Sequence, residues 1–141
     1  MIGRWTVILV IFFFMTAVSY AGNGMEQPGH ITKILLDESW NSKKIELKVG
    51  DEIQIKLQGT GASGYAWYFN KLDHDFFQLI REERERGKKG GGEIVGSPIQ
   101  YIWVIKAKKM GNSMIEMSYY RIWEGKDKAI QEFEVEVDII P

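Results

Sequence analysis

The stretch Gln131-Glu-Phe-Glu-Val-Glu-Val-Asp-Ile-Ile140 alternates apolar and mostly acidic side chains along nearly its whole length. Successive side chains of a β-strand point to opposite faces, so a period of two predicts a half-buried strand. Phe133, Val135, Val137 and Ile139 would then face a core, and the row of carboxylates would face water.

The same alternation recurs in residues 43–49 and 52–57, with the turn pair Gly50-Asp51 between them. Residues 99–107 are apolar on both faces, which predicts a central strand buried on both sides. The run 81–86 alternates charges of both signs and fits either a helical turn or a strand end. Further short strands are expected at 31–36, 65–69, 76–80 and 113–120.

Seven or eight short strands, turn signals about every ten residues and no convincing amphipathic helix predict an all-β, immunoglobulin-like antiparallel β-sandwich. The sequence shows no internal repeat and no second domain. The residues expected inside are Ile53, Ile55, Trp67, Trp103, Ile115, Phe133 and Val135.

The first residues carry a different signal: Arg4 precedes the apolar run 7–18, and Ser19-Tyr-Ala21 follows it. This order is typical of a cleaved secretory signal peptide, here residues 1–21. A retained membrane anchor is the alternative, but the run is shorter than the roughly 20 residues that a spanning helix needs. We expect a flexible lead at 22–30, one domain at 31–141, and a periplasmic or secreted location.

The composition argues against several functions. The chain has no Cys and a formal net charge of −1, so it offers no thiol chemistry and no charge excess for nucleic acid or a membrane surface. Its two histidines, His30 and His74, have no metal-ligand spacing. The glycines at 61 and 64 lack the context of a nucleophile elbow. We therefore expect no enzyme activity, no cofactor and no metal.

The stretch Gly59-Thr-Gly-Ala-Ser-Gly-Tyr-Ala-Trp67 is the candidate working loop. Glycines and small residues let a backbone approach another molecule closely. Tyr65 and Trp67 lie at i and i+2 of the following strand and point to one face, where they can anchor the loop in the core. The alternative is a plain connection between strands.

Two more connections would join this loop at one end of a Greek-key sandwich. They are the Gly-rich segment that ends in Gly96-Ser-Pro98, and the segment 119–124. The latter contains Arg121 and Trp123, residue types that are enriched in interface hot spots. The alternative is that Trp123 caps the core and Arg121 pairs with a neighbouring acid, with no role in binding.

The order Ser63-Gly-Tyr-Ala-Trp67, Val95-Gly-Ser-Pro98 and Tyr120-Arg-Ile-Trp-Glu124 resembles the chagasin family of cysteine protease inhibitors. The corresponding loops of that family read Asn-Pro-Thr-Thr-Gly-Tyr, a Gly-rich turn similar to Val-Gly-Ala-Pro-Gly, and Arg-Pro-Trp. The resemblance covers nearly all of the chain after the signal segment. The residues that depart from these motifs are Thr60, Gly61, Ala62, Ser63, Ile99 and Ile122.

The resemblance implies an immunoglobulin-like inhibitor of papain-like cysteine peptidases, and we expect it to be monomeric, competitive and reversible. The loop 59–64 would enter the catalytic cleft, and loops 90–98 and 120–125 would hold its rims. The alternative is a non-inhibitory immunoglobulin-like binding module of the cell envelope. The residues implied in peptidase binding are Thr60, Gly61, Ala62, Ser63, Gly64, Tyr65, Gly96, Ser97, Pro98, Arg121 and Trp123.

Overall fold

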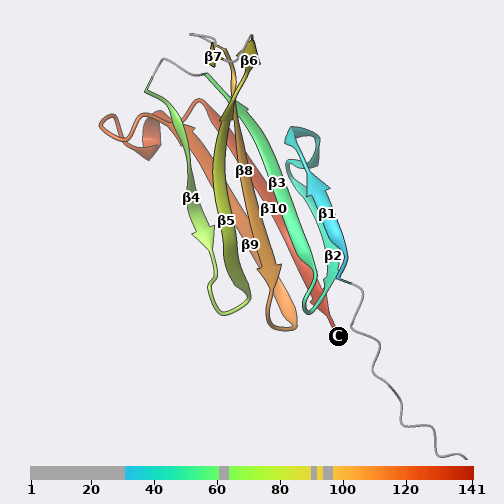
Figure 1. The fold of residues 1–141 in the computed structure, drawn as a ribbon. Coiled ribbons are helices and arrows are strands. Elements are labelled where there is room, and N and C mark those ends of the chain that lie inside the picture. Colours follow the sequence, from blue (N-terminus) through green and yellow to red (C-terminus); the bar gives the residue numbers. More distant parts are fainter. Residues whose placement is uncertain (1–30, 61–63, 90–91, 94–96) are drawn as a thin grey trace, which may run out of the picture.

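A computed structural model describes residues 31–60, 64–89, 92–93 and 97–141 of the chain. They form two four-stranded sheets that pack face to face (Figure 1). The first sheet has the order β1 (Lys33–Leu36), β3 (Glu52–Gly59), β8 (Ile99–Ala107), β5 (Phe77–Arg86). The second has the order β2 (Lys43–Lys48), β10 (Gln131–Ile140), β9 (Gly111–Tyr120), β4 (Ala66–Leu72).

Short elements complete the fold. The 3-10 turn η1 (Glu38–Trp40) carries the chain from the first sheet to the second, and η2 (Lys126–Lys128) lies between β9 and β10. The strands β6 (Lys88–Lys89) and β7 (Gly92–Glu93) pair with each other beyond the end of β5. No helix in the described part of the chain is long and apolar enough to cross a membrane. The predicted signal segment and lead lie outside the described residues.

The predicted all-β sandwich is confirmed, but not every neighbouring pair is antiparallel. β1 pairs with β3 in parallel, and β2 pairs with β10 in parallel. The buried Asp51 carboxylate helps to hold the edge strand β1 beside β3. It accepts hydrogen bonds from the backbone N–H groups of Thr32 at 2.8 Å and Lys48 at 3.0 Å. Alternation reveals which face of a strand is buried, but it does not reveal the direction of the neighbouring strand.

The core consists of the inward-facing side chains of both sheets. The predicted core residues Ile53, Ile55, Trp67, Trp103, Ile115, Phe133 and Val135 are all buried. β8 is buried on both faces, as expected, because Ile102 and Val104 on its outer face are only 4% and 3% exposed. Of the acidic residues that alternate along β10, Glu132 and Glu134 are exposed, and Glu136 and Asp138 are half-buried.

The charged run 81–86 is a strand, not a helical turn. It continues β5, and Arg81 to Arg86 pair with β8 after a register shift between Leu79 and Arg81. Arg84 lies opposite the core residue Tyr101, and its guanidinium lies 5.2 Å from the centre of that ring. Charged side chains on an edge strand discourage pairing with other sheets.

The strand register brings three connections to one end of the sandwich. Gly59 at the end of β3 and Arg86 at the end of β5 both pair with Ile99 at the start of β8. Ala66 at the start of β4 pairs with Tyr120 at the end of β9. The β3–β4, β5–β8 and β9–β10 connections therefore leave the sandwich together, at the upper end in Figure 1.

Candidate functional site

The first loop leaves β3 through a backbone position that has no room for a side chain. A Cβ atom at Gly59 would lie 2.7 Å from Cε2 of Tyr101 and 2.8 Å from the hydroxyl oxygen of Tyr119. The next residue, Thr60, donates its backbone N–H to that same hydroxyl oxygen at 2.7 Å. Glycine at position 59 thus lets two buried tyrosines reach the base of the loop.

Four aromatic rings form the base on which this loop stands. Tyr119 stacks on Tyr65 with ring centres 5.5 Å apart, and it contacts Trp67 at 5.2 Å and Tyr101 at 6.5 Å. The Trp67 indole N–H donates to the backbone oxygen of Gln58 at 2.9 Å, which ties β4 to β3. The predicted anchoring by Tyr65 and Trp67 is present, with Trp67 buried and Tyr65 half-buried.

Burial has an electrostatic effect on this base. It raises the pKa of Tyr101 above its usual value, and the neighbouring Tyr119 adds to the shift. The Tyr101 hydroxyl donates to the backbone oxygen of Tyr65 at 3.5 Å.

The third loop holds Arg121 and Trp123 at the surface. Trp123 is 69% exposed, so the alternative that it caps the core is wrong. Arg121 does pair with a neighbouring acid, because its Nη1 lies 3.0 Å from Oε1 of Glu124. The same guanidinium lies 4.6 Å from the centre of the Tyr65 ring, a cation–π distance.

The first and third loops touch each other. Gly64 has φ +75°, and a Cβ atom there would lie 2.2 Å from Cη2 of Trp123. The edge of the indole therefore lies directly against the backbone of Gly64. Two segments that the sequence separates by almost sixty residues form one continuous surface.

The middle loop is described at β7 and at its end, Ser97 and Pro98. Pro98 is exposed, and with Thr60, Tyr119 and Ile130 it lines a pocket of about 480 Å³ beside the first loop. Ser97 is half-buried, and its Oγ has no hydrogen-bond partner among the described residues. The candidate residues Gly61, Ala62, Ser63 and Gly96 lie outside the described residues.

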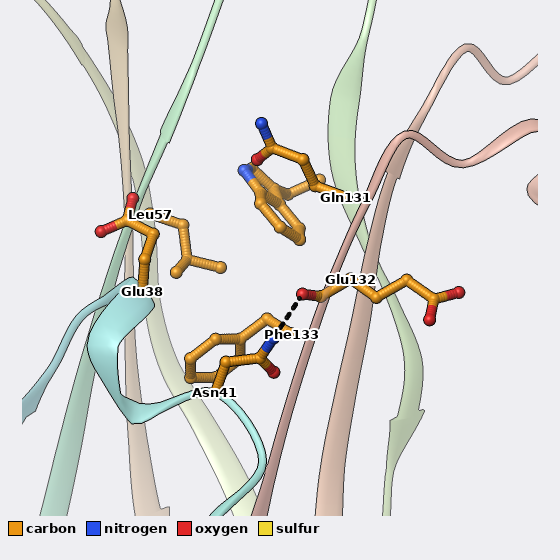
Figure 2. A pocket seen from close by; sticks show the side chains of 7 residues that line it. Glu38, Asn41, Leu57, Gln131, Glu132 and Phe133 are labelled. Atoms are coloured by element: carbon orange, nitrogen blue, oxygen red, sulfur yellow. Dashed lines mark hydrogen bonds between the residues drawn. The ribbon is translucent and has the colours of Figure 1, made fainter.

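A second pocket, of about 380 Å³, opens between the sheets and shares Glu38 and Gln131 with the first (Figure 2). Two of its polar side chains already serve the fold. Glu38 accepts the backbone N–H of Gln58 at 2.6 Å, and Asn41 donates to the backbone oxygen of Glu132 at 3.1 Å. Asn41 also accepts the N–H of Glu134 at 2.8 Å. Its side-chain amide therefore pairs with the backbone of β10 just before the pairing with β2 begins. The Glu38 and Asn41 side chains in this pocket therefore help to hold the strands together.

Within the ranges the structure covers, no group of three His, Cys, Asp or Glu side chains is placed to hold a metal ion. His74 is exposed in the β4–β5 turn, and its backbone oxygen accepts a hydrogen bond from Lys108 at 2.7 Å.

Sequence reasoning assigned Tyr119 to the third loop and gave it no role in the site. The structure places it in β9, 1% exposed, directly beneath Thr60. A signal was present, because Tyr119 has the same parity as the inward-facing Ile115 and Met117. Periodicity predicts the face, but it does not predict that the hydroxyl reaches a loop 59 residues away.

Residues 46–137 match the family described as Chagasin family peptidase inhibitor I42. The crystal structure of the cysteine protease inhibitor EhICP2 from Entamoeba histolytica is similar, with a TM-score of 0.70 and 25% identity over 79% of this chain and 98% of that one. Among curated proteins, none gives a significant match.

Two other solved structures share the fold at 23% identity. The solution structure of Amebosin has a TM-score of 0.63 and covers 77% of this chain and 98% of its own. PbICP-C, solved in complex with falcipain-2, has a TM-score of 0.51 and covers 77% of this chain and 99% of its own. Both support the β-sandwich.

The fold and the family match define a class of protein: a cysteine protease inhibitor built on a β-sandwich, and not an enzyme. The chain belongs to the chagasin family of peptidase inhibitors, whose match spans well over half of its residues.

Proposed function

We propose that this chain inhibits papain-like cysteine peptidases reversibly and competitively, with the 59–64 loop in the catalytic cleft and the loops 90–98 and 120–125 on its rims. The observation that carries the proposal is the contact between Gly64 and Trp123 at the end of the sandwich where the three connections meet. It joins the first and third loops into one surface of small and aromatic residues.

The shape of this surface supports obstruction as the mode of action. The chain at Gly59 and Gly64 carries no side chain, and the rings beneath these positions are packed against one another. Loop ends that are held on a packed base suit insertion into a cleft, because little conformational freedom is lost when they dock. The falcipain-2 complex of PbICP-C gives a precedent, at the level of the fold, for a peptidase partner.

We also propose that the protein acts as a monomer in the periplasm or outside the cell, after removal of residues 1–21. The absence of Cys from the sequence is compatible with an exported protein that depends on its core for stability. The extent of that core, which draws on both sheets, supports independent folding of the single domain.

The test is a measurement of the inhibition constant of residues 22–141 against papain and a second papain-like peptidase. Inhibition should increase with the concentration of the protein and be overcome by excess substrate. Full peptidase activity should return after dilution. Mass spectrometry should find the intact inhibitor without a covalent adduct. A folded protein that binds neither peptidase and slows neither one contradicts the proposal.

The replacement of family motif residues at Thr60, Gly61, Ala62 and Ile122 favours one alternative, a binding module that no longer inhibits. Binding without loss of peptidase activity, measured by calorimetry alongside the kinetic assay, would select it. In that case the loops would contact the peptidase away from its active site.

A further inference from the structure

One buried hydroxyl lies under Thr60, where the candidate loop leaves β3. We call this end of the loop its first leg, and Gly64 and Tyr65, which lead into β4, its second leg. The oxygen of Tyr119 accepts the backbone N–H of Thr60 at 2.7 Å and lies 3.2 Å from its Oγ1. It is also within 3.4 Å of the backbone oxygen of Thr60. A single side-chain atom therefore approaches the donor, the acceptor and the hydroxyl of the residue where the loop begins.

The same segment of chain also contacts the second leg of the loop. Two and four residues after Tyr119, Arg121 stacks over Tyr65 at 4.6 Å and Trp123 lies against Gly64. The end of β9 and the turn that follows it thus touch the loop where it leaves the first sheet and where it enters the second.

The hydroxyl has a fixed position because its ring cannot move freely. Tyr119 is 1% exposed and is packed between Tyr65, Trp67 and Tyr101. Tyr119 lines the pocket beside the first loop, but at that exposure its ring offers almost no surface to a partner protein. Any effect of the hydroxyl on binding must therefore act through the residue that it holds, Thr60.

We propose that Tyr119 is a positioning residue for peptidase binding, which fixes the first leg of the 59–64 loop while Arg121 and Trp123 fix the second. This inference rests on the proposed function. A loop whose legs are held before docking gives up less freedom in the complex, and a larger share of free molecules has the binding geometry.

The first test is Tyr119→Phe, which removes one oxygen and keeps the ring in its stack. One hydrogen bond contributes a factor of about two to ten to an equilibrium, and we expect inhibition to weaken by that factor. The matched control is Tyr68→Phe, which removes a tyrosine hydroxyl from β4, where the ring packs on Tyr120 with centres 4.8 Å apart. That control should inhibit like the parent.

The second test measures the Thr60–Tyr119 hydrogen bond directly, by amide hydrogen exchange. In the parent protein, the amide of Thr60 should exchange its hydrogen slowly, and in Tyr119→Phe it should exchange at least several-fold faster. The amide of Ile105 in the core strand β8 should exchange alike in both proteins, which shows that the sandwich is intact. A purely structural role for Tyr119 would instead change both amides together.

The outcomes separate the inference from the proposed function. If the parent inhibits and a folded Tyr119→Phe inhibits equally well, the inference is wrong and the proposed function stands. If the parent does not inhibit, the proposed function fails, and the exchange of the Thr60 amide alone decides whether Tyr119 holds the loop. If the variant does not fold, fast exchange of Thr60 in the parent still overturns the inference, and slow exchange supports it.

Discussion

Gly59 shows how one backbone position makes the loop base possible. Tyr101 and Tyr119 occupy the volume where a side chain at position 59 would lie, and both rings are about 1% exposed. Their neighbours are packed around them, so neither ring can withdraw without disturbing the core. The glycine is required by space here, since its φ lies outside the left-handed range.

We expect Gly59→Ala to lower the free energy of unfolding by about 1–3 kcal/mol, the usual cost of overpacking a core. Urea denaturation measures the change. The control is Gly92→Ala, because a Cβ atom at Gly92 meets nothing within 4 Å. A Gly59→Ala protein as stable as the parent would mean that the two tyrosines leave more room than the structure shows.

Trp123 is exposed enough for its truncation to spare the fold. We expect Trp123→Ala to change the free energy of unfolding by less than about 1 kcal/mol, and to weaken peptidase binding by about 1–3 kcal/mol, as does Arg121→Ala. The inhibition constants and thermal melts of the variants measure both effects. Met110→Ala, an exposed apolar residue in the β8–β9 turn at the opposite end, is the control. Unchanged inhibition by both loop variants would remove the third loop from the interface.

At the residue scale, sequence reasoning succeeded where side-chain period determines burial and left open what depends on contacts between loops. Phe133 and Trp103 were assigned to the core from alternation, and both are buried. For Trp123, two readings remained, because a tryptophan beyond a strand end either turns inward or lies on a neighbouring loop. Gly64, which leaves room for the indole, is remote in sequence.

At the scale of the elements, the first loop is where an added side chain should weaken inhibition most. We expect Gly64→Trp to abolish inhibition, since the φ of +75° disfavours any side chain and the space next to Gly64 is filled by Trp123. Inhibition assays with thermal melts test this. The control is Gly50→Trp, which places the same side chain at another glycine of positive φ, in the β2–β3 turn at the far end. A folded Gly64→Trp protein that inhibits like the parent would exclude this loop as the inserted element.

Strand existence was predictable, but strand partners were only partly so. The charged run that became the second half of β5 has no apolar period to mark it, and it is a strand because β8 supplies a partner along its length. Likewise, the parallel edges at β1 and β2 depend on contacts such as those of Asp51 and Asn41, which link residues far apart in the chain.

At the scale of the whole molecule, charges at the surface make stability depend on pH. Hydrogen bonds from Asn112 at 2.7 Å, and then from Lys44, lower the pKa of Glu136 below its ordinary value of 4.5. Hydrogen bonds from Ser39 lower the pKa of Asp37 below 3.8. The charged form of both carboxyl groups is therefore stabilised in the folded state.

A carboxyl group with a lowered pKa contributes stability above the pKa of the unfolded chain, and that contribution disappears as the pH falls through the folded pKa. The free energy of unfolding should therefore decrease on acidification from about pH 5 to about pH 3. Asn112→Ala keeps the Glu136 carboxyl but removes the largest cause of its shift, and Glu136→Gln removes the titration. Urea denaturation at several pH values should give both variants a smaller decrease than the parent over this interval. If the three proteins lose stability equally, the Asn112–Glu136 contact does not persist in solution.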